Sequence, residues 1–98
     1  MKVIADLTMI PIGVGVSLSK YVAACEKVLR KTELKTNLHP NGTNIEGEWD
    51  DVFAAIKRCH EALHEMDAPR VFTVIKAGTR VDREQTMDDK VESVEKKL

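Results

Sequence analysis

The segment His60-Glu61-Ala62-Leu63-His64 carries the most suggestive chemical pattern in this sequence. Two histidines one helical turn apart, with a glutamate after the first, form the H-E-x-x-H pattern of zinc peptidases, in which the glutamate is a general base. A catalytic zinc site also needs a third ligand and a substrate cleft. The candidate third ligands have no distinctive spacing; they are Glu84, Asp88 and Asp89.

The apolar stripe of the same segment argues against a metal site. Cys59 and Leu63 must face the core of a helix, and this turns His60 and His64 toward the helix flank or solvent. We therefore expect solvated or helix-capping histidines and no bound metal. A zinc-dependent hydrolase stays open as a remote alternative.

A second polar pattern surrounds Glu46, within the stretch Asn41 to Gly47. Strand alternation places Asn44 and Glu46 on one face, and Lys76 of the last predicted strand points the same way. A covered carboxylate needs a hydrogen-bond or charge partner. We expect Glu46 to make such a bond, either with Lys76 in a subunit interface or with the amino group of a ligand.

Gly13-Val14-Gly15 is too short for a dinucleotide-binding fingerprint, which needs a third glycine and a parallel β-α-β unit. It indicates a flexible loop before a helix. The free amide groups of that helix leave open a contribution of the loop to a pocket.

Apolar periodicity predicts four strands and three helices that would position these groups. Pro11 and Gly13 are expected to end the first strand, and Pro40-Asn41-Gly42 suits a hairpin turn. Strands are expected at 2–10, 34–39, 43–49 and 70–78. Helices are expected from Ser17 or Ser19 as N-cap to about Lys31, from Asp50 or Asp51 as cap to Met66, and from Thr86, in capping-box spacing with Asp89, to Leu98.

The order β-α-β-β-α-β plus a C-terminal helix predicts a single α+β ferredoxin-like domain over residues 1–98. Both long helices would cover one face of a four-stranded antiparallel sheet. The open face would then mix polar and apolar side chains, which are Ile4, Asp6, Thr8, Ile10, Asn37, His39, Asn44, Glu46, Phe72, Val74 and Lys76. Its apolar members predict a homo-oligomer that uses this face.

Composition excludes several classes of partner. The 98 residues carry 15 basic and 16 acidic side chains, and aromatics are 4% of the chain, so nucleic acid is not expected to bind. No apolar run approaches the roughly 20 residues of a membrane span, and no signal peptide is recognisable. We expect a cytoplasmic protein with no membrane partner, in which Cys25 and Cys59 are reduced core residues.

Five stretches together resemble one family of small proteins. They are MIPIG, LSKYVAACEKVL, NGTNIEGEWDDV, RVFTVIKAGTRVD and DDKVESV, and the most specific is G-T-x-I-E-G from Gly42 to Gly47. Together they are similar to the thiamine-binding, YkoF-like family over essentially the whole chain. The resemblance implies a ferredoxin-like fold and dimers assembled into tetramers.

The same resemblance implies binding of thiamine or its hydroxymethylpyrimidine moiety, without catalysis or cofactor. It implies Thr43, Asn44 and Glu46 as ligand-facing positions, and the open face adds Thr8, Phe72 and Lys76 to the expected site. The alternative is an assembly or regulatory module that has no small ligand and uses its open face only to oligomerise.

Overall fold

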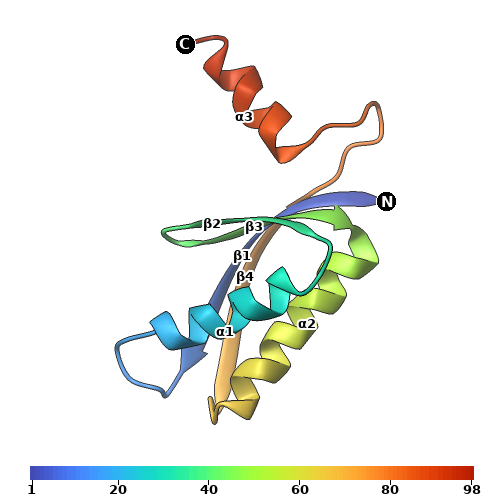
Figure 1. Ribbon diagram of the computed structural model, residues 1–98. Helices are drawn as coiled ribbons and strands as arrows, with labels where there is room; N and C mark the ends of the chain where they lie inside the picture. Colours follow the sequence, from blue (N-terminus) through green and yellow to red (C-terminus); the bar gives the residue numbers. More distant parts are fainter.

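A four-stranded antiparallel sheet forms the centre of the computed structural model, which describes all residues from 1 to 98. Its strands are β1 (Lys2–Ile12), β2 (Lys35–His39), β3 (Gly42–Glu48) and β4 (Arg70–Gly78), in the spatial order β2-β3-β1-β4. The helices are α1 (Ser19–Arg30), α2 (Trp49–Glu65) and α3 (Met87–Glu95) (Figure 1). The predicted α+β ferredoxin-like arrangement is confirmed.

Helices α1 and α2 lie side by side on one face of the sheet (Figure 1). The core lies between them and the sheet because each central strand turns alternate residues toward the helices. Val3, Ala5 and Leu7 of β1 and Ile45 of β3 are buried there, and α1 and α2 add the apolar stripe Tyr21, Cys25, Leu29, Val52, Ala55, Ile56, Cys59 and Leu63.

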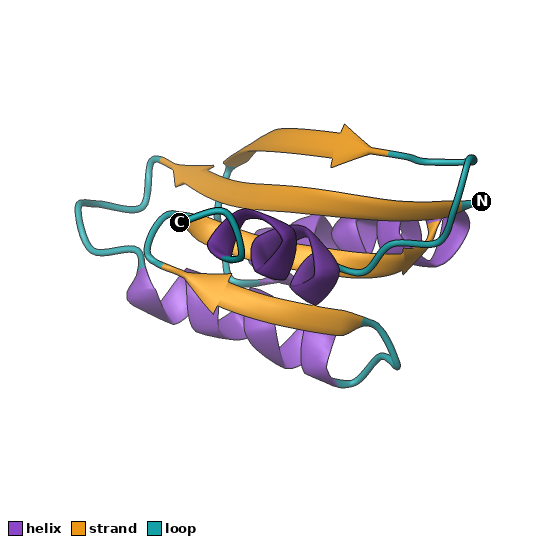
Figure 2. Ribbon diagram, turned by 90° about the horizontal axis from the view of Figure 1, so that it is seen from above, coloured by secondary structure: helices purple, strands orange, loops and turns teal.

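The third helix lies on the other side of the sheet, away from α1 and α2 (Figure 2). It contains no buried residue, and its link to the sheet includes a 2.5 Å ion pair between Lys35 of β2 and Asp88. Most of the open face is therefore uncovered in one chain. No helix is long and apolar enough to cross a membrane.

Strand β1 is longer than the alternation predicted, because Pro11 does not end it. The strand continues to Ile12, which pairs with Arg70 of β4. Proline lacks an N–H, but at Pro11 this group would point away from β4, so no hydrogen bond of that ladder is lost.

Two of the predicted helix starts are wrong. Helix α1 has Leu18 at its N-cap and no side-chain cap, so neither Ser17 nor Ser19 fills that role. Helix α2 begins at Trp49 rather than after an aspartate cap, since the Trp49 N–H completes the β1–β3 ladder by bonding the Met1 carbonyl and the chain turns helical at once.

The start of α3 follows its prediction. The Thr86 hydroxyl accepts a hydrogen bond from the Asp89 N–H at 3.1 Å, and the Asp89 carboxylate accepts one from the Thr86 N–H at 3.0 Å. This reciprocal capping box holds the pKa of Asp89 below its usual value, because the Thr86 N–H bonds the ionised carboxylate.

Candidate ligand-binding site

A notch opens where strand β3 is shorter than its neighbour β1. Pairing of β1 with β3 ends at Leu7 and Thr43, whereas β1 continues along β4 for five more residues, to Ile12. The turn before β3 comes close to β1 at this point, and a Cβ on Gly42 would lie 2.6 Å from the Leu7 carbonyl oxygen. The edge of β1, the β2–β3 turn and α1 together enclose a cavity of about 660 Å³.

The walls of this cavity, which we call the notch cavity, are mostly apolar. They include residues of β1, of α1 and its N-cap, and of β2, namely Leu7, Met9, Ile10, Leu18, Val22, Cys25, Leu29 and Leu38. The polar groups are Thr8, His39, Asn41 and Thr43, and the Thr8 hydroxyl donates to the Asn41 carbonyl at 2.8 Å. An apolar cavity of this size with a few converging polar groups suits a small organic molecule.

A buried hydroxyl–carboxylate pair includes Thr43, which lines the notch cavity, and Glu26, which does not. The Thr43 hydroxyl donates to Glu26 Oε1 at 3.1 Å, and the two residues are only 7% and 8% exposed. The second oxygen, Glu26 Oε2, is buried and has no hydrogen-bond partner. Burial of an incompletely bonded carboxylate costs free energy, so the charge of Glu26 is held here at a cost.

His39 and Asp6 form a second polar pair beside the turn. His39 Nε2 lies 2.5 Å from Asp6 Oδ1, and the Asn41 N–H donates to His39 Nδ1 at 3.4 Å. Because Nδ1 accepts a hydrogen bond, Nε2 carries the proton and donates to Asp6. The pair holds the His39 ring in place at the rim of the cavity.

Cys25 lines the notch cavity, but its thiol is not a reactive nucleophile. Both cysteines are free and buried, and the Cys59 thiol lies 3.8 Å from the Cys25 carbonyl oxygen. Hydrogen bonding with Cys59 and burial raise the pKa of Cys25, so its thiol stays protonated.

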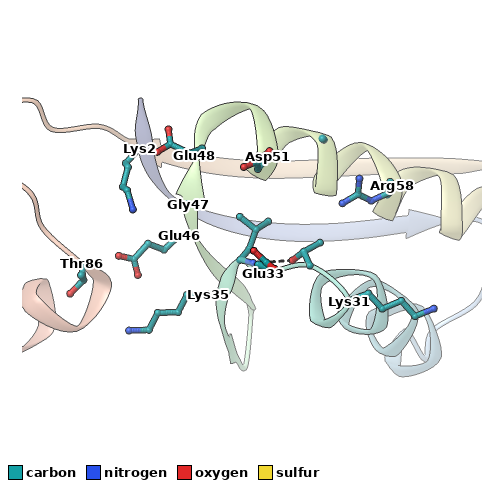
Figure 3. Close-up of a pocket in the computed structure, with 13 residues that line it drawn as sticks. Lys2, Lys31, Glu33, Lys35, Glu46, Gly47, Glu48, Asp51, Arg58 and Thr86 are labelled. Carbon is teal, nitrogen blue, oxygen red and sulfur yellow. Dashed lines mark hydrogen bonds between the residues drawn. The ribbon is translucent and has the colours of Figure 1, made fainter.

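A second and more polar hollow, of about 800 Å³, lies at the other end of the hairpin and surrounds Glu46. Figure 3 shows Lys2, Lys35 and Thr86 gathered around the Glu46 carboxylate, with Lys31 and Arg58 at the far end. Glu46 Oε2 is buried without a partner. Since charged side chains of both signs line most of this hollow, it offers a flat apolar ring little contact.

Within one chain Glu46 and Lys76 do not form an ion pair, and the pairing expected in a subunit interface stays a prediction. Lys76 stands opposite Asp6 in the β1–β4 register, and their side chains are 3.8 Å apart. Glu46 stands opposite Lys35, whose ammonium group bonds Asp88 instead. This bond raises the pKa of Lys35. Glu46 itself makes no hydrogen bond or ion pair within the chain.

The structure does not bring the residues predicted for the site together in one cavity. Thr8 and Thr43 line the notch cavity. Glu46 borders the polar hollow, and Asn44, Phe72 and Lys76 lie along the open face without lining either cavity. Two lining residues that the sequence did not single out as ligand-facing are His39 and Asn41, and Glu26, which bonds the lining residue Thr43, was not singled out either. The sequence pattern could have identified Glu26 as a buried acid. It follows Val22 and precedes Leu29 at helical spacing, which places a carboxylate on an apolar stripe.

The two histidines of the H-E-x-x-H segment do not converge on one point. His60 Nε2 lies 3.4 Å from the Thr73 hydroxyl, whereas His64 Nδ1 donates to the Ala68 carbonyl at 2.8 Å. Burial, followed by the nearby His64, lowers the pKa of His60. No group of three or more metal-ligating side chains is positioned to hold an ion.

Replacing His60 or His64 by alanine should therefore leave ligand binding unchanged, because neither side chain lines the notch cavity. Titration of His60→Ala and His64→Ala with hydroxymethylpyrimidine checks this, with Thr43→Val as the matched variant that should bind more weakly. Loss of bound zinc together with lost binding in either histidine variant would contradict it.

The fold is that of a small ferredoxin-like α+β protein, with one mostly apolar cavity at the end of the β1–β3 ladder. Residues 5–95 match the sequence model of the thiamine-binding protein family. The chain belongs to this family, which confirms the resemblance found in the sequence. The family and its relatives indicate no catalytic class.

Relatives of the chain are found in bacteria and archaea. A UPF0045 protein of Synechocystis is 60% identical over 97% of this chain and 78% of its own length. A solved structure of a hypothetical protein from Methanocaldococcus jannaschii is 35% identical, with a TM-score of 0.90 and 96% of each chain covered. A proposed thiamine biosynthesis/salvage protein of Thermotoga maritima shares the fold, with a TM-score of 0.81, 19% identity, and 96% of this chain and 99% of its own covered.

Proposed function

We propose that this protein binds thiamine or its hydroxymethylpyrimidine moiety in the notch cavity and catalyses no reaction on it. The observation that carries the proposal is the apolar cavity of about 660 Å³, whose lining residue Thr43 bonds the buried Glu26. Membership of the thiamine-binding protein family supports the choice of ligand.

The chemistry of the ligand matches the composition of the cavity. A methylated pyrimidine ring is flat and largely apolar, and it fits between the side chains of α1 and the sheet, such as Val22, Leu29 and Leu38. Its amino and hydroxymethyl groups can bond Thr8, Thr43 and Asn41. The positive charge of a thiazolium ring is favoured by the acidic groups close to the cavity, Glu26 and Asp6.

Calorimetric titration of the protein with thiamine, and separately with hydroxymethylpyrimidine, tests the proposal. We expect saturable binding of at least one of them, weakened about tenfold by Thr43→Val, because this variant removes one hydrogen-bonding hydroxyl and keeps the shape. Asn37→Ala is the control, since Asn37 lies on the open face outside the notch cavity. No heat of binding with either compound contradicts the proposal.

A second role, in self-assembly, is favoured by the uncovered apolar side chains. Phe72 and Val74 of β4 are 53% and 50% exposed on the open face, and Val91 and Val94 of α3 are 58% and 60% exposed. A monomer exposes few such patches unless they bind something. We propose that the protein is a homodimer or homotetramer that buries this face, and that it acts in the cytoplasm, where both free cysteines would stay reduced.

A further inference from the structure

The notch cavity contains an unpaired stretch of β-strand backbone at Met9. Residues of β1 alternate between bonding β3 and bonding β4, and the bond from Trp49 N–H to the Met1 carbonyl shows that odd-numbered residues face β3. Met9 is the next odd-numbered residue after Leu7, where the β1–β3 ladder ends. Its N–H and C=O therefore point into the cavity that Met9 lines.

No neighbouring element pairs with Met9 on the side where β3 has ended. Met9 is in register with Thr73 of β4, but the backbone groups of this pair point away from each other. Asn41 would stand opposite Met9 if the ladder went on, yet Asn41 bonds the Thr8 hydroxyl and His39 Nδ1 instead. Backbone bonds outside the helices and strands do not involve Met9. A half-buried donor and acceptor are thus left for an occupant of the cavity.

The free edge is too short to take up another strand. The next residue that faces this side is Pro11, which has no N–H to donate. Met9 alone offers a donor and an acceptor side by side, and beyond it this edge has only the Pro11 carbonyl. This arrangement suits a small planar molecule rather than an extended peptide.

We infer that the Met9 backbone selects an aminopyrimidine by pairing with its edge, an inference that rests on the proposed function of the notch cavity. The Met9 N–H donates to the ring nitrogen next to the amino group, and the Met9 C=O accepts a hydrogen bond from that amino group. A residue of a neighbouring strand would satisfy the same two groups in the same way. The ligand class is a heteroaromatic ring with an amino group beside a ring nitrogen.

This pairing predicts discrimination against the oxo analogue of the ring. In that analogue an oxygen replaces the amino group and the adjacent ring nitrogen carries a proton, so acceptor faces acceptor and donor faces donor. A site built to bond a substrate group rejects an analogue that leaves its polar groups unpaired. We expect the unaltered protein to bind oxythiamine at least roughly 100-fold more weakly than thiamine.

A backbone variant tests the same pairing from the protein side. Met9→Pro removes the N–H that the β1–β4 ladder does not use, as Pro11 already does two residues later, so the sheet should keep its pairing. We expect hydroxymethylpyrimidine to bind Met9→Pro at least tenfold more weakly, whereas Met9→Leu, with a similar side chain and an intact N–H, should bind as the original protein does. Circular dichroism establishes that both variants are folded.

A third measurement needs no variant. In a ¹H–¹⁵N spectrum of the whole protein, the Met9 amide resonance should move on titration with hydroxymethylpyrimidine more than that of Asp6, whose N–H bonds β4. Equal affinity for thiamine and oxythiamine, or a Met9 resonance that does not move in the bound protein, would overturn the inference while the proposed function stands. Absence of any binding would overturn both.

Discussion

Glu26→Gln should make the free protein more stable and its ligand binding weaker. The side chain is 8% exposed and one carboxylate oxygen is buried without a partner, so the charge at this position costs free energy in the absence of ligand. Glutamine keeps the shape and the acceptor for the Thr43 hydroxyl. We expect a gain of about 1 kcal/mol in the free energy of unfolding, which raises Tm by roughly 4–8 °C in a domain of this size.

The same substitution should weaken hydroxymethylpyrimidine binding about tenfold, because hydrogen bonds to a charged group are stronger than those to a neutral one. Thermal unfolding and calorimetric titration of the one variant measure both effects. Glu61→Gln is the matched control, since Glu61 is exposed on α2 outside the notch cavity. A variant that is less stable and binds normally would show that Glu26 is structural only.

Phe72→Asp should separate the proposed oligomer into monomers. Phe72 is the largest apolar side chain on the open face, and it is 53% exposed in one chain. In a two-fold symmetric contact every substitution occurs on both sides of the interface. A loss of about 2 kcal/mol per copy therefore amounts to about 4 kcal/mol per dimer, which is roughly a 1,000-fold rise in the dissociation constant.

Light scattering at micromolar concentration measures this change as a fall in mass from a multiple of 11.0 kDa to the mass of one chain. Val81→Asp serves as the control, because Val81 is 91% exposed but lies in the segment after β4. Phe72 does not line the notch cavity, although it stands opposite Ile10, which does, so ligand binding by the variant also bears on whether the site needs a second subunit. A monomeric original protein would contradict the proposal.

The order of elements and the two faces of the sheet could be predicted from the sequence alone. Val71, Thr73 and Ile75 alternate with Phe72, Val74 and Lys76, and the observed register places the first set toward the helices. Strand alternation, helical periodicity and the Thr86 capping box depend on residues at most a few positions apart. Such local patterns suffice because each is set by the geometry of its own element.

The site, in contrast, depended on how distant segments meet. Its cavity exists because β1 passes the end of β3, and this follows from pairing over about forty residues of intervening chain. The Asp6–His39 pair, the burial of Glu26 against Thr43, and the separation of Thr43 from Glu46 by the sheet arise in the same way. Sequence alone determined which side chains share a face; only the tertiary structure decided where pairing stops, because the end of a ladder is set by the lengths and turns of both strands together.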